Sequence, residues 1–278
     1  MSESFKGRLA DRVGVSCERL WTAALAARGP GVFPAPLLAP RGRERVLIVA
    51  PHPDDEAAGC AGAILAHVAA GDDVTVLVAT DGRRSRAFGL SEDEMARRRR
   101  GEAEAASAAL GASLSWIGLP ERAWDDEALS RPLDEAVQAI APAIVYAPSR
   151  VDFHPEHVRV ARSLARVLLG SAALVRVYQV QVPLARPLVN LVAGVGARAA
   201  KVDAILRLYE TQWGSLERTL RIRRYAAARH RLDGLAEEFR EMPAARYAAW
   251  HLDGAADRFR GMRKRAFTDP LSYAVGRA

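Results

Sequence analysis

Short apolar runs alternate with longer segments of mixed polarity through the middle of the chain. Five runs have the length of buried strands, and the four segments between them carry apolar positions at helical spacing. The runs cover residues 45–50, 74–79, 114–117, 143–147 and 174–182, and the helical segments cover 57–70, 91–110, 133–140 and 158–169. Strands that alternate with helices predict an α/β fold, with a mostly parallel sheet and helices on both of its faces.

The pattern changes on either side of this region. Residues 2–27 predict a weak helix, and prolines make the stretch after it an extended linker. After residue 183, two Arg-rich amphipathic helices are predicted at 197–213 and 215–239, followed by an irregular to helical tail. We therefore divide the chain into an N-terminal helical extension and linker (1–44), a main domain (45–213) and a C-terminal helical extension packed on it (214–278).

Composition restricts the class of protein. Half of the 278 residues are hydrophobic, yet no window approaches eighteen uninterrupted apolar residues, so we predict no transmembrane helix. The N-terminus lacks a signal-peptide pattern and the two cysteines indicate no disulfide framework, which together predict a cytoplasmic protein. The net charge of +7 is spread over the chain and aromatic residues are few, which argues against nucleic-acid binding. Peripheral contact with a membrane and homo-oligomerisation stay open.

Two polar clusters directly follow predicted strands. The first comprises His52, Asp54, Asp55 and Glu56, after the strand at 45–50, and the second comprises Asp152, His154, Glu156 and His157, after the strand at 143–147. Because the carboxyl ends of parallel strands meet at one edge of a sheet, we expect the two clusters to face each other there. His67, in contrast, lies inside a predicted helix and is expected to be a surface or packing histidine.

The residue types in the two clusters suit a metal centre. Catalytic Zn²⁺ takes three protein ligands and keeps one position for water. His52 and Asp55 provide two ligands, and either His154 or His157 provides the third. Asp54 is then placed as a general base, and the remaining histidine as an oxyanion stabiliser or proton donor. A helix start with acidic residues near its dipole would explain the carboxylates but not the histidines. The clusters therefore predict a metal-dependent hydrolase of an amide or ester.

These motifs resemble those of a known family. Residues 50–56, Ala-Pro-His-Pro-Asp-Asp-Glu, resemble the signature of the PIG-L/LmbE-like deacetylases, and residues 154–157, His-Pro-Glu-His, resemble the second motif of that family. The likeness continues in order through residues 80–82, 99–106, 116–119 and 201–212, so that it covers roughly residues 45–213.

The resemblance implies a Rossmann-like fold and the Zn²⁺-dependent removal of an acetyl group from a small N-acetylated sugar, usually an N-acetylglucosaminyl conjugate. Carried over by position, His52, Asp55 and His157 would bind the metal, Asp54 would be the general base, and His154 would stabilise the oxyanion or act as the acid. Arg99 would help form the substrate site, with Glu102 as its structural partner. We expect Asp152 to contact the substrate as well.

The chain departs from the family pattern in loops on the substrate side. Pro120-Glu121 stands where relatives often have an aspartate, Glu156 stands where the second motif usually has Asp, and three arginines, Arg83, Arg84 and Arg86, follow Gly82. These arginines favour an anionic substrate, although a solvated charged loop would have the same composition. Two alternatives to deacetylation also remain: an amidase for a larger acyl group on a thiol or natural-product conjugate, and a non-catalytic sugar-binding module.

Overall fold

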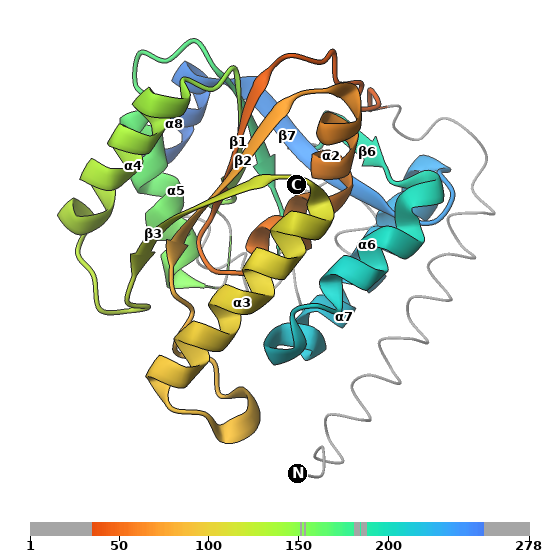
Figure 1. Ribbon diagram of the computed structural model, residues 1–278. Coiled ribbons are helices and arrows are strands. Elements are labelled where there is room, and N and C mark those ends of the chain that lie inside the picture. The colour runs from red at the N-terminus through yellow and green to blue at the C-terminus, as the bar shows by residue number, and fades with distance from the viewer. Residues whose placement is uncertain (1–34, 151, 153, 181–183, 185–187, 253–278) are drawn as a thin grey trace.

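A seven-stranded sheet lies between two layers of helices in the computed structural model, which describes residues 35–150, 152, 154–180, 184 and 188–252 (Figure 1). The strands are β1 (Arg45–Ala50), β2 (Asp73–Thr80), β3 (Ser113–Leu119), β4 (Ile144–Pro148), β5 (Leu174–Tyr178), β6 (Leu191–Gly194) and β7 (Ala236–Pro243). The α-helices are α2 (Asp55–Ala70), α3 (Glu92–Leu110), α4 (Asp126–Ile140), α5 (Pro155–Val167), α6 (Ala199–Leu206), α7 (Trp213–His230) and α8 (Ala244–Leu252).

The order of the strands creates a crevice beside β1. The sheet runs β3-β2-β1-β4-β5-β7-β6, and its first five strands are parallel. The chain moves outward from β1 through β2 to β3 and then returns to place β4 on the other side of β1. The loops that follow β1 and β4 therefore leave the sheet in opposite directions. Such a switch point is where ligands bind in open α/β sheets, and both predicted clusters follow these two strands.

Alternating side chains of β1 belong to two different cores. Val46 and Ile48 pack on the side of α2, whereas Leu47 and Val49 pack on the side of α4 and α5. This period of two is what a strand covered on both faces requires. Figure 1 shows α2, α3, α6 and α7 on one face of the sheet, and α4, α5 and α8 on the other. The predicted α/β fold with helices on both faces is confirmed.

Most predicted elements agree with the structure to within a few residues. The predicted capping box of α3 is present, with the Ser91 side chain accepting from the Glu94 backbone and the Glu94 side chain accepting from the Ser91 backbone. The helix predicted at 133–140 begins earlier, at Asp126, because Asp125 caps it by accepting from Ala128 N.

The prediction of one helix over 215–239 is wrong in its second half. Helix α7 ends at His230, and Ala236–Pro243 forms β7, inserted antiparallel between β5 and β6. The sequence pattern did not indicate β7 because two of its buried residues are charged. Glu237 is ion-paired with Arg223, and Glu238 with Arg229. Strand β6 was not predicted. The C-terminal region thus supplies a strand of the main sheet as well as helices α7 and α8.

Some sequence predictions are not addressed by this structure. The helix at 2–27 and the end of the tail lie outside the described residues, and the division into three segments stays a prediction. Among the described helices, none combines the length and the apolar character that a membrane span needs.

Candidate metal centre and active site

The two polar clusters meet at the carboxyl edge of the sheet, as predicted. His52 and Asp55 come from the turn between β1 and α2, and His154 and His157 come from the start of α5, after β4. Thr80 fixes the first turn from the neighbouring strand, because its backbone N–H and its hydroxyl both donate to Pro51 O, at 3.0 and 2.9 Å. The turn that carries the first cluster is therefore tied to the end of β2.

Three side-chain atoms form a nearly equilateral triangle. His52 Nδ1 lies 3.2 Å from Asp55 Oδ2 and 3.1 Å from His157 Nε2, and His157 Nε2 lies 3.1 Å from Asp55 Oδ2. All three residues are buried. Atoms bound tetrahedrally to one zinc ion at 2.0–2.1 Å are roughly 3.3–3.4 Å apart, so the triangle has nearly the size of such a ligand set. The residues present fit a metal ion.

Each histidine of the triangle has a carboxylate on its outer nitrogen. Glu156 Oε2 lies 2.9 Å from His52 Nε2, and Asp152 Oδ2 lies 3.2 Å from His157 Nδ1. Such carboxylates accept the outer N–H and leave the inner nitrogen with a free lone pair, which is the tautomer that a metal needs. Glu156 is itself held by Arg122 N and by Trp124 Nε1.

Asp152 was predicted to contact the substrate, but the structure places it elsewhere. It is buried behind His157, and its second oxygen accepts from His154 N at 2.9 Å. It is absent from the walls of the cavity described below. Sequence alone did not distinguish the two positions, because the neighbours of a carboxylate in a loop depend on how that loop folds back.

The carboxylates and histidines at the triangle hold one another in their charged forms, because the contacts with Asp55, Glu156 and Asp152 also raise the pKa of His52 and of His157 against the effect of burial. Burial opposes ionisation of Asp55, but the neighbouring His157 and His52 hold the pKa of its carboxyl well below the usual range. Burial would also raise the pKa of Glu156, but hydrogen bonds from His52 and from Arg122 N outweigh this effect and lower that pKa to about 2. Both carboxylates are therefore ionised beside the two histidines.

Asp54 lies beside the triangle and has a strained backbone. Its φ of 133° is in a region that L-residues rarely adopt, and it directly precedes the first turn of α2. Arg99 Nη2 donates to Asp54 Oδ1 at 2.8 Å and also to Pro53 O, while its Nη1 donates to Gly82 O at 3.1 Å. A Cβ at Gly82 would collide with this guanidinium, so the glycine makes room for it. Burial raises the pKa of Asp54 to about 7, against the opposing effect of Arg99.

The predicted partnership of Arg99 with Glu102 is wrong. Glu102 accepts from Thr211 N and Oγ1, at 3.1 and 2.6 Å, and so joins α3 to the segment before α7. The carboxylate paired with Arg99 is Asp54. Arg99 was predicted to contact substrate, and it does line the cavity. Its guanidinium already donates hydrogen bonds to Asp54 and to two backbone carbonyls.

His154 borders the triangle without entering it. Its ring meets that of His52 edge-on, with centroids 4.5 Å apart, and its Nε2 lies 3.8 Å from Glu121 Oε1. Its Nδ1 is buried with no hydrogen-bond partner among the described residues. Burial and the nearby His52 and His157 lower the pKa of His154 to about 4. His154 also belongs to two other sets of potential metal ligands. One joins it to His52 and His157, and the other joins it to His52, Glu121 and Glu156.

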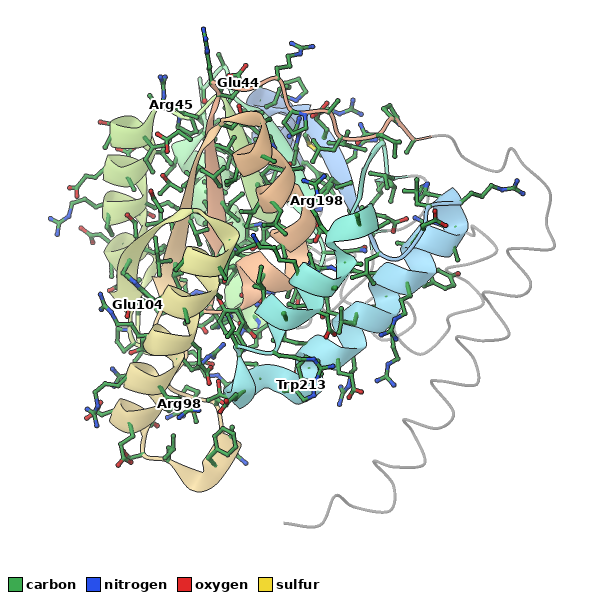
Figure 2. All side chains as sticks on the ribbon, turned by 45° about the vertical axis from the view of Figure 1, so that its right-hand side comes forward. Glu44, Arg45, Arg98, Glu104, Arg198 and Trp213 are labelled. Carbon is green, nitrogen blue, oxygen red and sulfur yellow. The ribbon has the colours of Figure 1, made fainter. Side chains whose placement is uncertain are left out.

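A cavity of about 490 Å³ opens over this centre. Its lining includes the residues of both clusters and of nearby elements: His52, Asp54, Asp55, Arg99, His154, His157, Glu121, Arg122, Arg84, Gln212 and Arg218. Figure 2 shows Arg98 and Trp213 at the same end of the molecule, opposite Glu44 and Arg45 at the start of β1, so α3 and α7 flank the end where the parallel strands finish. The cavity has room for a sugar-sized molecule above the histidines.

Sequence reasoning missed several cavity residues. Glu121 follows the end of β3, so its position after a strand was a signal that could have marked it as part of the same edge. Arg122 shared that signal. Arg218 had none, because it reaches the cavity from α7, whose packing over the edge depends on tertiary structure. Of the three arginines after Gly82, only Arg84 lines the cavity, while Arg83 pairs with Asp81 at 2.7 Å.

The fold and centre define an α/β protein with a His–carboxylate centre at the switch point of its sheet. Residues 47–168 match the model of the PIG-L family, described as GlcNAc-PI de-N-acetylase. The resemblance of this segment to the PIG-L family is therefore confirmed.

Individual relatives carry related names. Over 160 residues the chain is 29% identical to 1D-myo-inositol 2-acetamido-2-deoxy-alpha-D-glucopyranoside deacetylase of Rhodococcus erythropolis, a match that covers 47% of this chain and 54% of the relative. The chain spans about half the length of the curated relatives it matches.

Solved structures extend the likeness in fold. N,N'-diacetylchitobiose deacetylase from Pyrococcus horikoshii superposes with a TM-score of 0.64 at 20% identity, covering 89% of this chain and 96% of that one. The 4-carboxy-2-hydroxymuconate hydratase of Pseudomonas putida superposes with a TM-score of 0.59 at 19% identity, covering 71% of this chain and 95% of that one. Proteins with this fold thus carry different activities, so the function of this chain has to be argued from its site.

Proposed function

We propose that the protein is a zinc-dependent hydrolase that removes the acetyl group from an N-acetylated amino sugar. The observation that carries the proposal is the triangle of His52 Nδ1, Asp55 Oδ2 and His157 Nε2, with a carboxylate behind each histidine. The family match over residues 47–168 and the names of the relatives support the same reaction.

His52, Asp55 and His157 would hold the metal. We prefer this set to the two that contain His154, because its three atoms lie within 3.2 Å of one another and each histidine has its outer nitrogen oriented. Two nitrogens and one carboxylate oxygen suit zinc. Bound there, zinc supplies a Lewis acid that polarises the amide carbonyl and acidifies water.

Asp54 would act as the general base. Its carboxylate adjoins the triangle, and Arg99 fixes one of its oxygens through a hydrogen bond of 2.8 Å. The other oxygen can take a proton from the attacking water and pass it to the leaving amine. The strained backbone at Asp54 holds its side chain over the cavity. With an unstrained backbone at the helix start, the side chain would instead turn toward the backbone amides of the helix. Removing a general base typically lowers a rate by about 10²–10⁴-fold.

His154 would stabilise the oxyanion. It lines the cavity beside His52, and in the described structure its ring makes no strong hydrogen bond that would hold its Nε2 away from a ligand. An N–H donated to the carbonyl oxygen as negative charge develops would lower the barrier to attack. His154 would in this way complement the Lewis-acid chemistry that a metal held by His52, Asp55 and His157 would supply.

Acetate release from N-acetylated amino sugars tests the proposal. Zinc-loaded protein should release acetate from at least one member of a panel of N-acetylglucosamine conjugates, and Asp54→Asn should lose about 10²–10⁴-fold in kcat while keeping its zinc. Asp203→Asn, a surface change in an exposed ion pair on α6, is the matched control and should have no effect. Release of longer acyl groups but not of acetate would instead favour an amidase. Stoichiometric zinc or sugar binding without any hydrolysis would favour a binding module.

A further inference from the structure

Three exposed arginines approach the cavity from three different elements. Arg84 lies in the loop after β2, Arg122 in the loop after β3, and Arg218 on the first turns of α7, and all three line the cavity. The two loops are joined directly, because Arg84 N donates to Glu121 Oε2 at 2.9 Å. Arg84 and Arg122 therefore stand on one stretch of wall, and Arg218 belongs to the helix that contributes the other lining residues from Ser215 to Ile222.

The carboxylates of the cavity cannot balance these arginines. Its walls carry three carboxylates, Asp54, Asp55 and Glu121. Asp54 is paired with Arg99, and Asp55 belongs to the triangle. Glu121 alone remains to face the three exposed arginines, and a divalent metal on Asp55 would add further positive charge.

The existing partners of the three arginines are weak or missing. Arg122 Nε lies 3.6 Å from Glu121 Oε1, which is too long for a hydrogen bond. Arg84 pairs with Glu92, but both side chains are about half exposed, and such pairs contribute little. No hydrogen bond or ion pair to another described residue engages the Arg218 guanidinium.

We propose that Arg84, Arg122 and Arg218 form a subsite for an oxyanion group, so that the substrate is an N-acetylated amino sugar bearing a phosphate or a carboxylate. The proposal rests on the function proposed above and names its substrate class. Guanidinium groups match both oxyanions because they present parallel N–H donors. The subsite lies in the same cavity as the triangle, so one substrate would place its acetamido group at the metal centre and its anionic group among the arginines.

Kinetics on charged and neutral sugars test the subsite. The probes are N-acetylglucosamine 6-phosphate, N-acetylglucosamine 1-phosphate, N-acetylmuramic acid and neutral N-acetylglucosamine. We expect kcat/KM to be highest for a charged sugar, mainly through a lower KM, and the best probe then separates phosphate from carboxylate. Replacing Arg218 or Arg122 by Gln should reduce the ratio of kcat/KM for charged over neutral sugar about tenfold or more. Arg131→Gln, an exposed arginine on α4 away from the cavity, should leave the ratio unchanged.

The outcomes separate this proposal from the deacetylase proposal. If acetate is released with equal kcat/KM from charged and neutral sugars, the subsite is wrong and the deacetylase assignment stands. If no sugar releases acetate, the deacetylase assignment fails, and calorimetry of the zinc-loaded protein with the same four sugars decides the subsite. Tighter binding of a charged sugar that Arg218→Gln weakens would support it. Equal binding of all four sugars, or binding that Arg218→Gln leaves unchanged, would overturn it.

Discussion

Helix α2 has a histidine–aspartate pair at each end, and the two pairs differ in nearly every other respect. At its start, His52 and Asp55 meet His157 below a cavity. At its end, His67 Nδ1 lies 2.6 Å from Asp72 Oδ2, and His67 Nε2 lies 3.0 Å from both Tyr146 Oη and Arg176 Nη1. His67 is fully buried, which selects the second of the two predicted alternatives, a surface or a packing histidine.

The difference lies in which group supplies the donors and the positive charge. At the His67 end, Asp72 accepts the Nδ1 proton, while Nε2 faces the donors of Tyr146 and Arg176, so the cluster is complete within the protein. At the His52 end, two imidazole nitrogens and a carboxylate oxygen converge at 3.1–3.2 Å. A metal cation among the three atoms would satisfy all of them at once. The same residue types thus make a structural cluster at one edge of the sheet and the proposed metal site at the other.

The most decisive test of this comparison is to replace one aspartate at each end of α2. Asp55→Ala should abolish stoichiometric zinc binding and with it acetate release. Asp72→Ala should keep zinc but lose about 2–3 kcal/mol of unfolding free energy, because His67 and Glu44 N each lose an acceptor. Metal analysis and urea unfolding of both variants check these crossed effects. Zinc retained at one ion per chain in Asp55→Ala would remove that residue from the ligand set.

A second prediction concerns the carboxylates behind the two site histidines. Glu156→Gln and Asp152→Asn should each weaken zinc affinity about 10–100-fold, because the outer nitrogens of His52 and His157 lose the acceptor that orients them. Competition with a zinc chelator measures this change. Equal zinc affinity in the wild type and in Asp152→Asn would contradict the orienting role of Asp152 and favour the substrate contact first predicted for it.

A third prediction concerns the cation of the structural cluster. Arg176→Met should cost about 2 kcal/mol of unfolding free energy, since His67, Tyr146 and Glu241 each lose a charged donor. Zinc content should not change. The partly exposed Glu241 keeps this cost below that of a fully buried pair. A loss of zinc in this variant would show that the two ends of α2 are coupled, contrary to the comparison.

The smallest expected effect is on pH dependence. Burial, with help from Arg176, lowers the pKa of His67 in the folded protein relative to the unfolded chain. The folded state therefore binds fewer protons, so this stabilisation is present above the unfolded pKa of about 6.5 and is lost as pH falls below it. Unfolding free energies of metal-free wild type and His67→Asn, measured between pH 8 and pH 5, should converge as the pH falls. A constant difference would contradict the shift.

The sequence located the two clusters of the proposed metal site better than their surroundings, for a physical reason. His52, Asp55 and His157 each follow a strand end, and parallel strands bring such ends to one edge. Strand β7 was missed because Glu237 is buried against Arg223, a pairing between distant segments that has no local signature. The position of Asp152 and the presence of Arg218 at the cavity were missed for the same reason, because both depend on how loops and helices pack over the carboxyl edge of the sheet.

Anomalous diffraction from crystals of the zinc-loaded protein tests the ligand set most directly. We predict one strong zinc peak bonded to His52 Nδ1, Asp55 Oδ2 and His157 Nε2 at about 2.0–2.2 Å, with Glu156 and Asp152 outside the bonding distance. A peak bonded instead to His154, Glu121 and Glu156, or no peak near His52, would contradict the proposed centre.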